Sequence, residues 1–186
     1  MASPLKQEAR INGRHGTVFW FTGLAGAGKT TIGKLFYRRL KKNRQNAVFL
    51  DGDVLRRVFD SPLDHSLAHR RKIAARNARL CKVLSDQGIH VVCATISLFR
   101  ALHAWNRAHI RNYREIFVRA PMKVLIKRDA KKLYSRALRG KIRNVMGIDL
   151  PAEEPKNPDA IIDNDGTQTP ASLARFLFSA FEDGRL

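Results

Sequence analysis

The sequence predicts an α/β fold in which helices cover both faces of a doubly wound, mainly parallel sheet. Short apolar runs alternate with longer segments whose apolar residues recur every three or four positions, a pattern typical of strands alternating with helices. A glycine-rich loop separates the first strand from the first helix. The 186 residues, 44% hydrophobic, suit one compact domain. We expect this domain at 17–186, after a polar N-terminal arm at 1–16.

The first strand is expected at 18–22, because a short apolar run bounded by glycines is typical of a central strand that is covered on both faces. A helix from Lys29 to about Lys42 follows, with its apolar residues on one stripe. Four side chains form that stripe: Ile32, Leu35, Phe36 and Leu40. The next elements are a strand at 47–50, a helix at about 66–87 ended by Gly88, a strand at 89–95, a helix at about 102–111 and a strand at 115–119.

The remaining third of the chain predicts a lid and the end of the domain. A short helix around 124–126 follows Pro121. Residues 129–150 are basic with few apolar anchors, and we interpret them as a mobile helical lid. A proline-punctuated loop, a strand at 160–163 and an amphipathic helix at 172–181 complete the domain.

The loop at 23–30 reads Gly-Leu-Ala-Gly-Ala-Gly-Lys-Thr and matches the phosphate-binding P-loop pattern between a strand and a helix. Its glycines let backbone amides approach phosphate oxygens. Lys29 is expected to stabilise charge during phosphoryl transfer, and the Thr30 hydroxyl to ligate Mg²⁺. The predicted ATP-binding residues here are Gly23, Leu24, Ala25, Gly26, Ala27, Gly28, Lys29, Thr30 and Thr31.

Two carboxylates, Asp51 and Asp53, follow the second strand and should border the same crevice as the loop. One can orient an attacking hydroxyl and accept its proton, while the other can hold Mg²⁺ through water. The alternative is that Asp53 only caps the segment beginning at Val54. The neighbouring loop favours the catalytic interpretation.

Composition limits the other classes of function. The net charge of +19 will attract polyanions, but the basic residues are spread along the whole chain without a nucleic-acid-binding signature. No apolar run approaches the roughly 20 residues of a membrane span, and the N-terminus lacks a signal peptide's apolar segment. We expect a cytoplasmic protein without membrane insertion. Cys81 and Cys93 lie in apolar segments and are expected to be buried free thiols.

The chain resembles the adenylylsulfate kinase family, whose members use ATP to phosphorylate the 3′-hydroxyl of adenosine 5′-phosphosulfate. The likeness covers about residues 15–182. The segments that carry it are 22–31, Leu-Asp-Gly-Asp at 50–53, Cys-Ala-Thr-Ile-Ser-Leu-Phe-Arg at 93–100, Arg-Asp-Ala-Lys-Lys-Leu-Tyr at 128–134, Gly-Ile-Asp at 147–149 and Glu-Pro-Lys-Asn-Pro at 154–158.

The resemblance implies roles for individual residues. Asp53 would be the catalytic carboxylate, Arg56 and Arg70 would hold the acceptor's anionic 5′ group, and Lys131 would act from the lid. Arg128 is assigned to the ATP side. Asp51 and three residues that follow a strand are assigned to the acceptor side: Ile96, Ser97 and Phe99. The resemblance also implies ATP and a small nucleotide conjugate as partners, together with Mg²⁺, and it is compatible with a homodimer.

Four departures from the family fall on the acceptor side. The two phenylalanines that sandwich adenine in the family are replaced by His65 and Val145, and its aspartate and asparagine by His69 and Ile73. Two lost aromatic stacks weaken binding by one to two orders of magnitude, at about 0.5–1.5 kcal/mol each. Three hypotheses follow in this order: an adenylylsulfate kinase, a kinase for another conjugate such as cytidine diphosphoramidate, or a domain without turnover. A regulatory nucleotide-binding or nucleic-acid-binding module is the alternative from another class.

Overall fold

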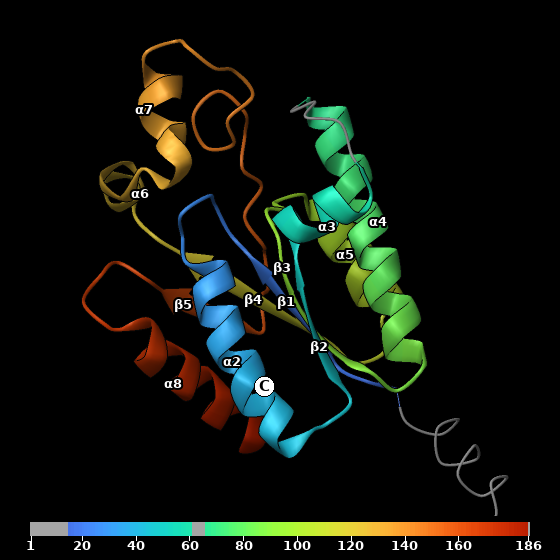
Figure 1. Cartoon of the computed structure of the whole chain (residues 1–186). Helices are drawn as coiled ribbons and strands as arrows, with labels where there is room; N and C mark the ends of the chain where they lie inside the picture. Colours follow the sequence, from blue (N-terminus) through green and yellow to red (C-terminus); the bar gives the residue numbers. More distant parts are fainter. Residues whose placement is uncertain (1–14, 61–65, 186) are drawn as a thin grey trace, which may run out of the picture.

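The computed structural model describes residues 15–60 and 66–185, so nearly all of the predicted arm at 1–16 lies outside the described residues. The chain forms a sheet covered by helices on both faces (Figure 1). The elements, in chain order, are β1 (Val18–Thr22), α2 (Lys29–Asn43), β2 (Ala47–Asp51), α3 (Gly52–Val58), α4 (Leu67–Asp86), β3 (His90–Ala94), α5 (Arg100–His109), β4 (Tyr113–Arg119), α6 (Met122–Arg128), the 3₁₀ turn η1 (Ala130–Lys132), α7 (Leu133–Leu138), β5 (Ala160–Asp163) and α8 (Pro170–Glu182). The α/β prediction is confirmed.

The five strands are all parallel, in the order β2-β3-β1-β4-β5. The chain first moves outward from β1 to β2, returns through β3, and then crosses to β4 and β5 on the other side of β1. This reversal beside β1 is the switch point at which ligands bind in doubly wound sheets. The carboxyl ends of β1, β2 and β3 therefore meet at one edge.

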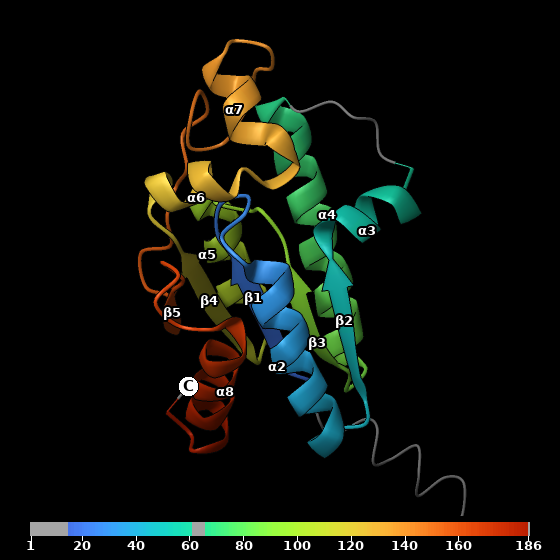
Figure 2. The ribbon, with the colours of Figure 1, turned by 60° about the vertical axis from the view of Figure 1, so that its left-hand side comes forward.

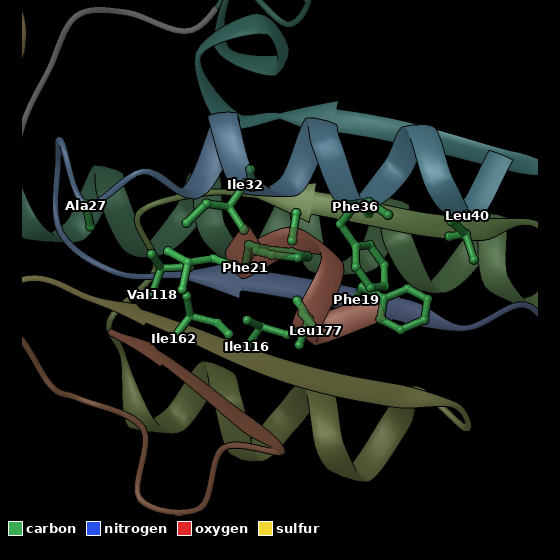
Figure 3. Close-up of a cluster of buried hydrophobic side chains, with 14 of the residues drawn as sticks. Phe19, Phe21, Ala27, Ile32, Phe36, Leu40, Ile116, Val118, Ile162 and Leu177 are labelled. Carbon is green, nitrogen blue, oxygen red and sulfur yellow. The ribbon is translucent and has the colours of Figure 1, made fainter. Parts of the chain in front are cut away.

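Alternate residues of β1 enter two separate cores, because successive side chains of a strand point to opposite faces. Phe19 and Phe21 pack with Phe36 of α2 and Leu177 of α8 (Figure 3). Val18 and Trp20 pack instead with side chains of α4 and α5. The strand is buried at every position, which fixes the loop that follows it.

Sequence periodicity missed α3. This helix has seven residues, and only Leu55 of these is buried, so it has no repeating apolar stripe to find. Its N-cap is Asp51, whose side chain accepts hydrogen bonds from the amides of Asp53 and Val54. The proposal that Asp53 is the cap is therefore wrong, and its carboxylate is left for other contacts.

The segment predicted as a lid, 129–150, forms η1, α7 and an irregular loop beyond the carboxyl ends of the strands (Figure 2). At the start of the segment, the Asp129 side chain accepts hydrogen bonds from the amides of Tyr134 and Ser135. Tyr134 is fully buried and its hydroxyl donates to the carbonyl of Ala25 at 2.8 Å. The helical character of the segment agrees with the prediction, and its movement remains a prediction.

Two further expectations concern sulfur and membranes. Cys81 and Cys93 are buried and unpaired, as predicted. Within residues 15–60 and 66–185, no helix combines the length and the apolar character needed to cross a bilayer.

Phe36→Ala should lower the free energy of unfolding by about 3–5 kcal/mol, because Phe36 is fully buried and its ring contacts Phe19, Phe21 and Phe178. Urea unfolding followed by circular dichroism would measure the change. Phe176→Ala on exposed α8 surface is the matched control, and its effect should stay within about 0.5 kcal/mol. Equal losses in both variants would contradict this account of the core.

Candidate active site

The P-loop connects β1 to α2 with several residues in the left-handed region of backbone space. Gly23 has φ +144° and Gly28 has φ +101°, values that favour glycine. A side chain at Gly28 would also collide with the amide of Asn164. Gly28 precedes the first residue of α2, so the loop presents a helix N-terminus and successive backbone amides. This arrangement is suited to binding phosphate oxygens.

Lys29 is the first residue of α2, and only 8% of it is exposed. Its ammonium group donates to the carbonyl of Leu24 at 2.7 Å, across the loop. Burial lowers the pKa of Lys29 to about 8, although the charges of Asp53 and Asp51 oppose the shift. The amine therefore lies at the loop with its proton less firmly held than in an ordinary lysine.

Thr30 and Asp51 form a pair of hard oxygen donors beside the loop. The Thr30 hydroxyl donates to Asp51 Oδ2 at 2.7 Å, while Asp51 Oδ1 caps α3. Mg²⁺ is commonly held by one or two such protein oxygens together with phosphates and water. The pair fits that donor set, and no group of three or more His, Cys, Asp or Glu side chains suitable for a metal occurs in the described part of the chain.

Asp53, in the first turn of α3, faces the lid. Lys131 Nζ donates to its Oδ2 at 2.6 Å, joining residues 78 positions apart. Burial alone would raise the pKa of Asp53, but the hydrogen bond and charge of Lys131, with Arg56 and Lys29, outweigh burial and lower it. Asp53 is therefore ionised at neutral pH, and its carboxylate can accept a hydrogen bond from an incoming hydroxyl.

A cavity of about 460 Å³ joins these groups. Residues from the P-loop, α3, α4, the end of β3 and the lid line it, including both carboxylates and both arginines of the predicted site. Burial, and then the charge of Arg56, lower the pKa of Arg70. Two neighbouring guanidinium groups in a cavity favour an anionic ligand. Arg70 also donates to the lid carbonyl of Asn144 at 2.9 Å, so the lid contacts this wall of the cavity.

Two predicted acceptor residues lie elsewhere. Ser97 is fully buried, and its hydroxyl accepts a hydrogen bond from the Trp20 indole at 2.9 Å. Phe99 is 3% exposed and packs in the core under α4 and α5. Neither side chain lines the cavity, whereas Ile96 does, so the assignment of Ser97 and Phe99 to the acceptor stays a prediction. The P-loop members Gly23, Leu24 and Ala27 likewise lie behind the cavity surface.

The four departures from the family pattern have different positions. Ile73 lines the cavity. Val145 is 2% exposed and belongs to the core, so it offers no surface for a base. His69 lies in the first turn of α4, where its amide donates to the Ser66 cap. His65 lies outside the described residues. None of the described residues that line the cavity is aromatic.

Asn164 is a site residue that the sequence analysis missed. It is buried directly after β5, and its Nδ2 donates to the carbonyl of Ala27 at 2.8 Å. Arg128 donates to the Asn164 carbonyl at 3.0 Å and to the Gly26 carbonyl at 3.2 Å. Together the two side chains hold the P-loop from behind. A single asparagine more than 130 positions from the loop gives no local signal, so only the topology reveals it.

Comparison with known proteins gives concordant results. The family model described as adenylylsulphate kinase matches residues 15–163. A cytidine diphosphoramidate kinase of Campylobacter jejuni is 41% identical over 147 residues, which cover 79% of this chain and 85% of that protein. An adenylyl-sulfate kinase of Paraburkholderia xenovorans is 37% identical over 177 residues, covering 95% and 99% of the two chains.

A solved structure is similar as a whole. The APS kinase CysC of Mycobacterium tuberculosis, in complex with AMPPNP and APS, superposes with a TM-score of 0.83 at 31% identity, and the match covers 91% of this chain and 99% of that one. The similarity therefore extends over most of the chain.

The affinity for Mg-ATP should fall as the pH rises above about 8. A bound triphosphate favours the charged ammonium of Lys29, whose pKa in the free protein is about 8, so binding at higher pH must take up a proton. Titration calorimetry at pH 7 and 9, in buffers of different ionisation enthalpy, would measure both effects. Lys29→Arg should lose the pH dependence, because its guanidinium stays charged. Equal wild-type affinities at the two pH values would contradict the assignment.

Asn164→Ala should lower the free energy of unfolding by about 1–3 kcal/mol, because it leaves the buried carbonyl of Ala27 without its donor. It should also weaken binding of AMPPNP, since the P-loop loses support. Thermal unfolding and calorimetry would report the two losses. Asn157→Ala, at an exposed side chain, serves as the control and should change neither. Unaltered nucleotide affinity in Asn164→Ala would refute the supporting role.

Proposed function

Since the chain belongs to the adenylylsulphate kinase family, we propose that it transfers the γ-phosphoryl group of ATP to a ribose hydroxyl of a nucleotide conjugate. One observation carries the proposal: the P-loop with Lys29 and the carboxylate of Asp53 open into the same cavity. Donor and acceptor can thus meet in one cavity, where positioning supplies much of the catalysis.

The donor side would be built from the P-loop amides, Lys29 and the oxygen pair of Thr30 and Asp51. Lys29 would exchange the carbonyl of Leu24 for phosphate oxygens, which are stronger acceptors because they are charged. Mg²⁺, when bound through Thr30 and Asp51, would neutralise phosphate charge. The buried environment strengthens the attraction between Lys29 and the charge that develops on the transferred group.

The acceptor side would use Asp53, Arg56, Arg70 and Lys131. The two arginines would hold the anionic 5′ group, leaving the ribose hydroxyl near Asp53. Asp53 would orient this hydroxyl and receive its proton as the bond to phosphorus forms. Lys131 would then release Asp53 and turn to the phosphate charge, which would couple closure of the lid to the presence of both substrates.

Cytidine diphosphoramidate is our preferred acceptor. The cavity offers no described aromatic side chain for a purine to stack on, and Val145 is occupied by the core. The relative from Campylobacter jejuni, at 41% identity, carries that substrate in its name. Adenosine 5′-phosphosulfate, which sequence ranks first, is the second candidate, supported by the family model and by the solved complex with APS.

Release of ADP from Mg-ATP should be measured with cytidine diphosphoramidate, adenosine 5′-phosphosulfate, CDP and AMP as acceptors. We expect kcat/KM to be highest for the cytidine conjugate. Lys29→Ala should abolish turnover, and Asp53→Asn should lower kcat by about 10²–10⁴-fold while AMPPNP still binds. Preference for adenosine 5′-phosphosulfate would overturn the choice of acceptor alone. Failure of every acceptor with AMPPNP bound normally would overturn the kinase proposal.

A further inference from the structure

A second hollow, of about 250 Å³, lies between α4 and α5, and we call it the α4–α5 groove. It shares no lining residue with the catalytic cavity. Its main lining residues are Arg71, Ala75 and Arg79 of α4, Phe99, and Ala101 and Trp105 of α5. Apart from Phe99, which the resemblance assigns to the acceptor, the proposed reaction uses none of these side chains, so the groove needs an explanation of its own.

The groove is preformed by small and rigid side chains. Ala75 and Ala101 leave the space open where their helices face each other. The Trp105 ring is stacked on His109, with centroids 4.5 Å apart and planes at 12°, which holds the indole in one orientation. Phe99 is 3% exposed and forms part of an apolar floor. A ligand would therefore meet aromatic surface without first ordering it.

The charge around the groove is of one sign. Arg71 and Arg79 are eight residues apart on α4 and so lie on the same side of the helix. The Arg71 guanidinium lies 5.8 Å from the centroid of the Phe99 ring and makes only a 4.0 Å contact with Glu153. Arg79 is exposed and has no carboxylate within ion-pair distance among residues 15–60 and 66–185. No lining residue is acidic.

We propose that the α4–α5 groove binds a planar aromatic ring carrying an anionic group. The ring would pack against Trp105 and Phe99, and the anion would be held by Arg79 and Arg71. Such a ligand would be distinct from both substrates of the proposed reaction. Helix α4 also supplies Arg70 and Ile73 to the catalytic cavity. A ligand in the groove would therefore contact the same helix that lines the acceptor side of that cavity.

The test is a titration of the full chain with 1-anilinonaphthalene-8-sulfonate, a bicyclic ring with a sulfonate. Saturating Mg²⁺ and AMPPNP should be present to occupy the P-loop. We expect saturable binding of one probe per chain with increased fluorescence. Arg79→Gln should raise its Kd about five- to tenfold. Ala101→Leu should reduce binding more strongly, because it fills the groove and leaves both arginines in place.

Lys72→Gln is the matched control, since it removes the same charge from the same helix outside the groove. Its Kd should stay within about twofold of the wild type. Equal effects of Lys72→Gln and Arg79→Gln would overturn the proposal in favour of non-specific charge attraction. Wild-type affinity in Ala101→Leu would place the probe elsewhere. The probe could also bind only at protein concentrations too low for sedimentation velocity to detect a dimer. That result would make the groove a contact between two copies of the chain and would also overturn the proposal.

Discussion

The structure depends on the conformation of the P-loop between β1 and α2. Gly23, Gly26 and Gly28 have positive φ values that favour glycine, and β1 anchors the turn because each of its residues is buried. Asn164 and Arg128 fix the loop from behind, and Tyr134 fixes it from the lid side. Elements from both halves of the chain thus maintain one anion-binding turn.

Three cationic groups of the site are already bonded to other protein groups. Lys29 is bonded to a loop carbonyl, Lys131 to Asp53, and Arg70 to a lid carbonyl. Each bond takes the place of one that a phosphate or a hydroxyl would make. Substrates would therefore exchange bonds instead of creating them, so the gain on binding is the difference between a charged ligand oxygen and a protein acceptor.

Sequence reasoning succeeded where the signal is local. The P-loop glycines, the run of β1 and the stripe of α2 are each visible within about fifteen residues, and the order of elements followed from them. It gave no signal where position depends on distant partners: the contact of Ser97 with Trp20 and the support that Asn164 gives to Ala27 come from pairings across the sheet. The short helix α3 was not predicted, because its single buried leucine gives no helical periodicity.

Helix α4 separates the catalytic cavity from the α4–α5 groove and lines both. Arg70 and Ile73 line the catalytic cavity, while Arg71 and Ala75 line the α4–α5 groove, so neighbouring residues of one helix serve two different sites. One residue inserted ahead of Arg70 would rotate everything after it by about 100°, given 3.6 residues per turn. Arg70 would then take the position of Arg71 in the groove, and Lys72 would take that of Ile73 in the cavity. A change in the length of α4 ahead of Arg70 would therefore disturb both hollows together.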